Sequence, residues 1–135
     1  MEFQVATELK LLGLAVIIGL VQLMWAAAAA QPQRGVAWNI GPRDEPRPLT
    51  GVAGRLERAF ANYRETFPLF AAAVLAVYLA GRAGSPLSLY GAWIYVVARA
   101  AYVPLYAFGV PAVRSVAWGA ALAGLIMVLI ALFNA

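Results

Sequence analysis

Four long apolar runs are the feature that most constrains the fold of this chain. They lie at about 9–30, 66–81, 86–108 and 111–133 of a 135-residue sequence that is 64% hydrophobic. A helix that crosses a bilayer needs roughly 20 apolar residues, with a usable range of about 17–25. A soluble core of this size could not bury so much apolar surface, so the sequence predicts an integral membrane protein.

The second run reaches span length only if the charged residues before it belong to the same helix. We therefore expect spans at about 9–30, 57–81, 86–108 and 111–133. The turns between the last three are short, which makes neighbouring helices antiparallel. The predicted fold is an all-α, up-down four-helix membrane bundle that forms a single domain over residues 1–135.

The first apolar run has an alternative interpretation as a cleaved signal peptide. The segment "WAAAAAQ" offers the small residues of a cleavage site. However, the start "MEFQVATELK" is not basic, and the run exceeds the roughly 7–15 apolar residues of a signal core. We expect the helix to remain in the protein.

Residues 31–54 form the longest predicted connection, and their Pro and Gly content predicts a loop that cannot continue a helix. Basic residues gather at this end of the predicted bundle: Arg34, Arg43, Arg47 and Arg114. The opposite end carries only Arg82 and Lys10. The positive-inside rule then places the loop in the cytoplasm and both termini outside. The high Arg and Ala content favours a bacterial inner membrane.

The residue types present exclude several kinds of chemistry. The sequence has no cysteine and no histidine. This removes disulfides, the usual zinc sites and nucleophilic mechanisms based on Cys or His, and we expect no metal site. The net charge is +4, and the basic residues lie beside the spans. Membrane topology and anionic lipid head groups account for them there, so they do not indicate a nucleic acid.

A polar stripe opens the second span. Arg58, Asn62 and Glu65 follow the spacing i, i+4 and i+7, so they share one face of a helix. Such residues at membrane depth are costly and usually functional. Arg55 and Arg64 are better interpreted as structural residues that reach the membrane surface.

The third span carries a second stripe on one helix face. Its members, at offsets of 0, 4, 7 and 11, are Tyr95, Arg99, Tyr102 and Tyr106. A charged residue inside a span costs at least about 2.5–3.5 kcal/mol, so Arg99 requires a partner, and Glu65 is the expected one. Arg58 and Arg99 carry two positive charges and Glu65 carries one negative charge. One positive charge is therefore uncompensated. The pattern therefore predicts a polar, anionic ligand.

Two motifs resemble the MAPEG family, the membrane-associated proteins of eicosanoid and glutathione metabolism. They are "RLERAFANYRETFPLF" in the second span and "ARAAYVPLY" in the third. The resemblance implies a homotrimer of four-helix subunits that holds glutathione in clefts between neighbouring subunits. The small residues at 26–30 and the pair Ala120 and Gly124 are compatible with such close helix contacts.

The resemblance also implies roles for individual residues. The expected glutathione-binding set is Arg58, Asn62, Glu65, Arg99, Tyr102 and Tyr106. Arg114 is the candidate for stabilising the glutathione thiolate, although it matches the family pattern only after a one-residue shift beside Pro111. Thr66 also stands where some members have a tyrosine.

The implied function is a membrane-bound glutathione transferase or peroxidase that acts on apolar electrophiles. A nearby cation can lower the pKa of a thiol from its usual value of about 8.5, so the cofactor would supply the nucleophile that the chain lacks. Two alternatives remain open: a non-catalytic lipid-binding or scaffold protein of the same fold, and a structural subunit whose polar stripe serves packing.

Overall fold

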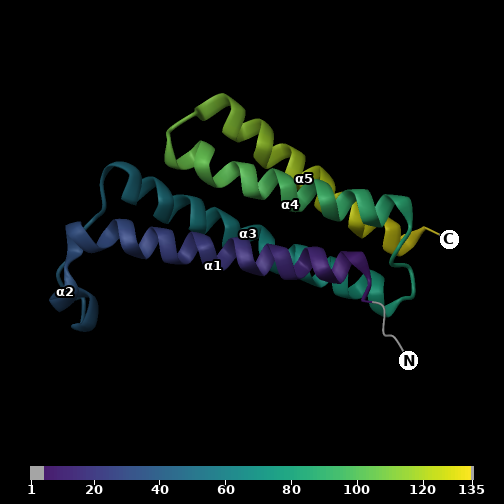
Figure 1. Cartoon of the computed structure of the whole chain (residues 1–135), viewed down its shortest axis with the longest axis horizontal. Coiled ribbons are helices and arrows are strands. Elements are labelled where there is room, and N and C mark those ends of the chain that lie inside the picture. Colours follow the sequence, from purple (N-terminus) through teal and green to yellow (C-terminus); the bar gives the residue numbers. More distant parts are fainter. Residues whose placement is uncertain (1–4, 135) are drawn as a thin grey trace.

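The part of the chain that the structure describes forms four long helices that alternate in direction. The computed structural model describes residues 5–134. The helices in this part of the chain are α1 (Thr7–Arg34), α2 (Val36–Ile40), α3 (Gly51–Leu79), α4 (Pro86–Ala107) and α5 (Pro111–Phe133). Figure 1 shows that the start of α1, the α3–α4 turn and the end of α5 lie at one end, and that α2 and the α4–α5 turn lie at the other. The predicted all-α up-down bundle is confirmed.

Helix α3 includes the charged residues that precede the second apolar run. It begins at Gly51, so residues 57–65 belong to the same helix. At 1.5 Å per residue its 29 residues extend for roughly 44 Å. This exceeds the hydrocarbon thickness of about 30 Å, so the first turns of α3 can lie at the membrane surface.

The four long helices differ in how apolar they are. Within residues 5–134, α1 and α5 are long and apolar enough to cross a membrane by length and composition alone. Helices α3 and α4 carry the two polar stripes, which lower their hydropathy. Buried polar side chains are not confined to these two helices, because Glu8 and Gln22 of α1 are also buried.

The predicted loop is more helical than expected. Helix α1 continues through Pro32 to Arg34, and α2 follows directly. Pro32 cannot donate a backbone hydrogen bond to the preceding turn, and the helix ends two residues later. Gly35 then ends α1 with a φ of 81°, a conformation that glycine adopts readily. The prediction that residues 31–40 form no helix was wrong.

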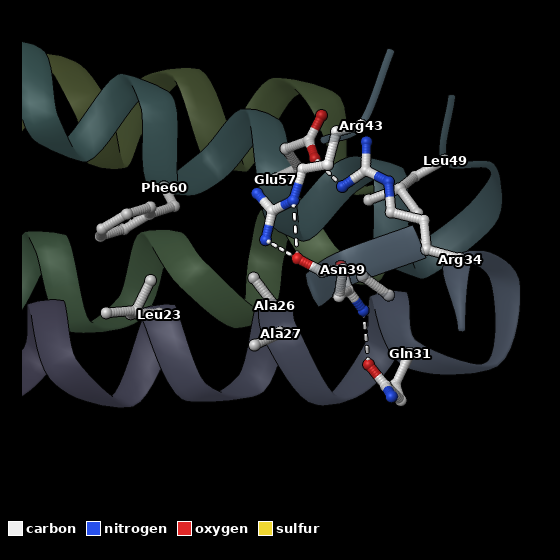
Figure 2. Close-up of a pocket in the computed structure, with 11 residues that line it drawn as sticks. Leu23, Ala26, Ala27, Gln31, Arg34, Asn39, Arg43, Leu49, Glu57 and Phe60 are labelled. Atoms are coloured by element: carbon white, nitrogen blue, oxygen red, sulfur yellow. Dashed lines mark hydrogen bonds and ion pairs between the residues drawn. The ribbon is translucent and has the colours of Figure 1, made fainter. Parts of the chain in front are cut away.

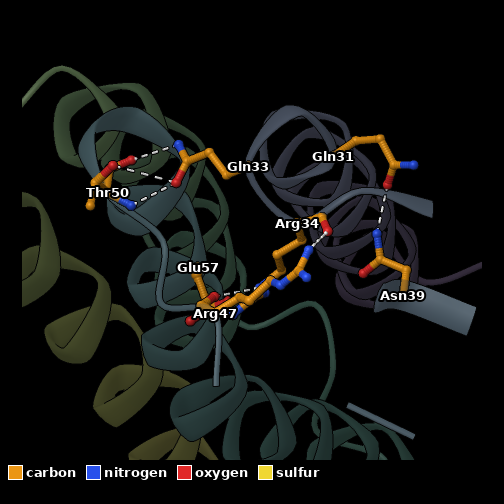
Figure 3. Close-up of polar contacts among 7 residues, drawn as sticks. All are labelled: Gln31, Gln33, Arg34, Asn39, Arg47, Thr50 and Glu57. Carbon is orange, nitrogen blue, oxygen red and sulfur yellow. Dashed lines mark hydrogen bonds and ion pairs between the residues drawn. The ribbon is translucent and has the colours of Figure 1, made fainter. Parts of the chain in front are cut away.

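Hydrogen bonds hold the remaining loop against the helix ends (Figure 3). Arg34 Nε donates to the Arg47 carbonyl at 3.0 Å, and Arg47 Nη1 donates to the Arg34 carbonyl at 2.8 Å. Gln33 bonds the backbone of Thr50 in both directions, at 3.0 and 2.9 Å. The loop is thus a fixed structure that joins α1 to the start of α3.

The core is not uniform along the bundle. The main buried cluster draws on all four long helices and includes Leu11, Phe70, Tyr95 and Val128. A smaller cluster, around Leu56, Val103 and Ala107, joins only α1, α3 and α4. The buried residues of α5 all lie between positions 121 and 131. The first half of α5 therefore stands away from the core.

Helices α4 and α5 cross at two glycines. A Cβ atom on Gly91 would lie 2.7 Å from the Gly124 carbonyl oxygen, and one on Gly124 would lie 2.5 Å from the Gly91 oxygen. Gly124 is thus used inside the chain, whereas its expected pair member Ala120 is exposed. Only residues without a side chain allow this approach of two backbones.

A buried carboxylate fastens α1 to the α3–α4 turn. Glu8 is 1% exposed, and its Oε2 atom accepts hydrogen bonds from the Gly84 backbone N–H and from Ser88 Oγ. The two partners lie at the turn and in the first turn of α4. This contact closes the end of the bundle opposite to the loop.

Candidate functional site

A polar cavity lies where α3, α4 and the exposed half of α5 meet. Its volume is about 260 Å³, and it is lined by Asn62, Tyr102, Tyr106, Arg114, Ser115 and Trp118. Four of these six residues belong to the set predicted from sequence. The fold therefore brings residues from three helices to one place.

Arg99 is buried beside this cavity. Its side chain is 0% exposed, and its Nη1 atom donates to Asn62 Oδ1 at 2.9 Å. The guanidinium carbon lies 4.3 Å from the centroid of the Tyr102 ring and 5.1 Å from that of Tyr63. Such cation–π contacts stabilise a desolvated arginine. Within residues 5–134, Arg99 Nε and Nη2 have no hydrogen-bond partner.

The expected ion pair between Arg99 and Glu65 is not formed. The described residues contain one ion pair, between Arg34 and Glu57, at 3.0 Å. Glu65 follows Asn62 by three residues, so it is rotated by about 60° around α3 relative to Asn62. This rotation leaves Glu65 exposed and lets the Asn62 amide take its place beside Arg99.

Tyr106 connects the arginines of α3 and α5. Arg58 Nε donates to the Tyr106 hydroxyl at 3.3 Å. The guanidinium carbon of Arg114 lies 4.5 Å from the centroid of the Tyr106 ring. The centroid of the Tyr102 ring is 5.6 Å from that of Tyr106. Arg58 itself is exposed and is not one of the lining residues, although it contacts Tyr106, which is.

Tyr95 shares the α4 stripe but is a core residue. It is 0% exposed, and its ring stacks on Phe70 with centroids 4.0 Å apart. Its hydroxyl and Thr66 Oγ1 form a hydrogen bond of 3.0 Å. Thr66 thus satisfies a buried tyrosine, and neither residue lines the cavity.

Three residues near Arg99 or the cavity were missed by sequence reasoning. Trp118 and Ser115 line the cavity, and Tyr63 lies against Arg99 while its hydroxyl bonds the Ala15 carbonyl. Trp118 follows Arg114 by four residues, so the helical spacing that revealed the other stripes also contains it. Tyr63 lies off its stripe, and no spacing rule indicates it.

Comparison with known proteins identifies the family. The family model of the MAPEG family matches residues 11–134. The chain belongs to the MAPEG family. A search of curated proteins found no match. Because the MAPEG fold is a membrane helical bundle, the four long helices are those of a membrane protein.

Family membership also supports a general role for this MAPEG protein. At the level of the family, that role is membrane-bound and glutathione-related, of the transferase or peroxidase type. Arginine, tyrosine and amide side chains converge at the polar cavity. It is therefore the candidate site for that role.

Proposed function

We propose that this MAPEG protein is a membrane-bound glutathione transferase or peroxidase that acts on apolar electrophiles. The observation that carries this proposal is the position of Arg114. It comes from α5, yet it lines the same cavity as Asn62, Tyr102 and Tyr106 from α3 and α4. A cation and several hydrogen-bonding groups thus surround one small space.

The charges of the site suit glutathione. Arg58, Arg99 and Arg114 against Glu65 leave two positive charges uncompensated. Glutathione carries two carboxylates and one ammonium group, so its thiolate form has two net negative charges. Carboxylates are the preferred partners of arginine N–H groups, and Arg99 retains two buried donors without a partner. Glu65 is exposed and suits the ammonium group.

Arg114 is the proposed catalytic residue. Bound glutathione would supply a thiol nucleophile. A cation beside a thiol favours the thiolate and lowers the thiol pKa from about 8.5. Arg114 is half-buried, and its contact with the Tyr106 ring holds the guanidinium at the cavity. The chain then needs no Cys or His of its own.

We also propose a homotrimer in the bacterial inner membrane. Arg58 and Glu65 are both exposed on α3, and Glu65 has no hydrogen bond or ion pair to any residue between 5 and 134. A carboxylate facing hydrocarbon is costly, so this face requires a neighbour. A second subunit would cover it and close the cavity. Light scattering in mild detergent should give a trimer mass, and a monomer would contradict this arrangement.

The electrophile would enter from the membrane. Trp118 lines the cavity and is 38% exposed, and the first half of α5 leaves the cavity open beside it. An apolar substrate dissolved in the bilayer could reach the site by this side without crossing water. Its own apolar surface would favour contact with the Trp118 ring.

Calorimetry with glutathione on the detergent-purified protein tests the proposal. We expect binding, together with the ultraviolet absorbance of a thiolate at neutral pH. S-methylglutathione should bind without that absorbance, because it has no ionisable thiol. Absence of glutathione binding would contradict the proposal. Binding without thiolate formation or turnover would favour the non-catalytic, lipid-binding alternative.

A further inference from the structure

A second cavity shares no lining residue with the candidate site. Figure 2 shows the residues that line it. It is formed by α1, the loop and the start of α3, and its volume is about 460 Å³. This lies in the range of about 300–1,000 Å³ that is usual for ligand sites. Its polar half includes Arg34, Arg43 and Asn39, and its apolar half includes Leu23 and Phe60.

The apolar half continues along the helices. A cavity of about 240 Å³ between α1 and α3 shares Leu23 and Phe60 with the first. Its other lining residues include Leu20, Phe67 and the side chain of Arg64. The two cavities together form the α1–α3 groove, which is polar at the loop end and apolar toward the middle of α1.

The two arginines at the polar end are held in place. The guanidinium carbons of Arg34 and Arg43 lie 4.8 and 5.4 Å from the centroid of the Trp38 ring. Arg43 Nε and Nη2 both donate to the Asn39 carbonyl, at 3.0 and 2.8 Å. Arg43 also has a φ of 58°, which is uncommon for a residue other than glycine and costs free energy.

Each arginine keeps one donor for a ligand. Arg34 uses Nη1 for Glu57 and Nε for the Arg47 carbonyl. Among the residues from 5 to 134, neither Arg34 Nη2 nor Arg43 Nη1 has a hydrogen-bond partner. Three arginines line the groove, Arg34, Arg43 and Arg64, and Glu57 is the one carboxylate among its lining residues. The groove therefore carries an excess of positive charge. The polar end is therefore suited to an anion.

We propose that the α1–α3 groove binds one anionic phospholipid. Its phosphate would contact Arg34 and Arg43, and one acyl chain would follow Leu23, Phe60 and Leu20. Three observations favour this occupant: the excess positive charge at one end, the apolar lining of the other, and the position of the polar end where α1 leaves its apolar run. This binding goes beyond the proposed glutathione chemistry and does not depend on it.

Native mass spectrometry of the full chain, released from micelles containing phosphatidylglycerol or phosphatidylcholine, tests this inference. We expect one phosphatidylglycerol to be retained per chain, and phosphatidylcholine to be lost. Arg43→Asn removes the charge, and Asn tolerates a positive φ. It should weaken phosphatidylglycerol binding about tenfold, while Arg43→Lys should retain much of it.

Two further variants keep the result interpretable. Lys10→Gln removes one charge at the opposite end of α1 and should leave lipid binding unchanged. Leu23→Asn, at the junction of the two cavities, should weaken binding of the long-chain lipid without affecting glutathione binding. Equal retention of the two lipids would overturn the inference, and so would equal losses in Arg43→Asn and Lys10→Gln.

Competition experiments separate the other occupants. Inorganic phosphate at millimolar concentration should not displace the lipid, because it lacks an acyl chain. Displacement by phosphate or by glutathione would overturn the inference, since the groove would then be a soluble-anion site or part of the glutathione site. Loss of the oligomer in Arg43→Asn together with loss of lipid would also overturn it and would identify the groove as a contact between copies.

Discussion

Asn62 accepts a 2.9 Å hydrogen bond from Arg99, and this bond joins α3 to α4 at the deepest charged group of the bundle. Asn62→Ala should lower the free energy of unfolding by about 1–3 kcal/mol, because it leaves a buried donor without a partner. Unfolding by a denaturing detergent measures the loss. Asn62→Ala combined with Arg99→Met should cost less than the sum of the two single changes. Strict additivity would contradict the coupling.

Arg58 and Arg64 provide a matched pair for the glutathione site. Arg58 contacts Tyr106 at the cavity, whereas Arg64 lies over the Phe60 ring on another face of α3. A charge-assisted hydrogen bond to a carboxylate contributes about 1.5–3 kcal/mol, so Arg58→Ala should weaken glutathione binding roughly ten- to hundredfold. Arg64→Ala should bind glutathione as the wild type does. Calorimetry on both variants measures this, and equal affinities would remove Arg58 from the site.

Arg114 should affect chemistry more than binding. In Arg114→Ala we expect glutathione still to bind, but the pKa of the bound thiol should rise toward about 8.5 because the cation is lost. The thiolate absorbance, titrated against pH, measures the shift, and kcat should fall more than the affinity for glutathione. Arg114→Lys should restore part of the thiolate. If Arg114→Ala showed normal thiolate absorbance and normal turnover, another cation would have to stabilise the thiolate.

One added methyl group at the α4–α5 crossing should lower the stability of the protein. Gly124→Ala would place a Cβ atom 2.5 Å from the Gly91 carbonyl oxygen, and such overpacking costs about 1–3 kcal/mol. Gly119→Ala is the control, because a Cβ there has nothing within 4 Å. Thermal unfolding in detergent should separate the two variants. Similar stability of both would mean that the helices can move apart without cost.

Topology can be tested with reporters at the C-terminus. The basic residues near the loop predict that both termini lie outside the cytoplasm. A fusion of alkaline phosphatase after Asn134 should be active, and a fusion of green fluorescent protein there should be dark. Fusions after Asp44, in the loop, should show the opposite behaviour. The reverse pattern would invert the bundle in the membrane.

The fold could be predicted from sequence because its determinants are local. Apolar runs of span length, short turns and helical spacing are all properties of neighbouring residues. The same spacing placed Asn62, Tyr102 and Tyr106 on faces that the structure brings together at one cavity. Arg114 could be placed there only through the family resemblance, because nothing local indicates how α5 sits against α3.

The predictions that failed concern contacts between helices. Glu65 was expected to pair with Arg99. Asn62, which lies about 60° away from Glu65 around α3, makes that contact instead. Tyr95 matched the stripe of α4, yet it lies in the core, where its ring stacks on Phe70 and its hydroxyl bonds Thr66. Charge and spacing restrict which residues share a face, but the rotation of each helix in the bundle decides which of them touch.

The contact between Glu8 and the α3–α4 turn implies an order of events during synthesis. Glu8 lies in α1, whereas its partners Gly84 and Ser88 are made 76 and 80 residues later. Until those residues are made, the Glu8 carboxylate lacks both of the donors that it contacts in the folded chain, and a carboxylate without partners favours water over hydrocarbon. Helix α1 can therefore reach its final position only after the start of α4 has been made.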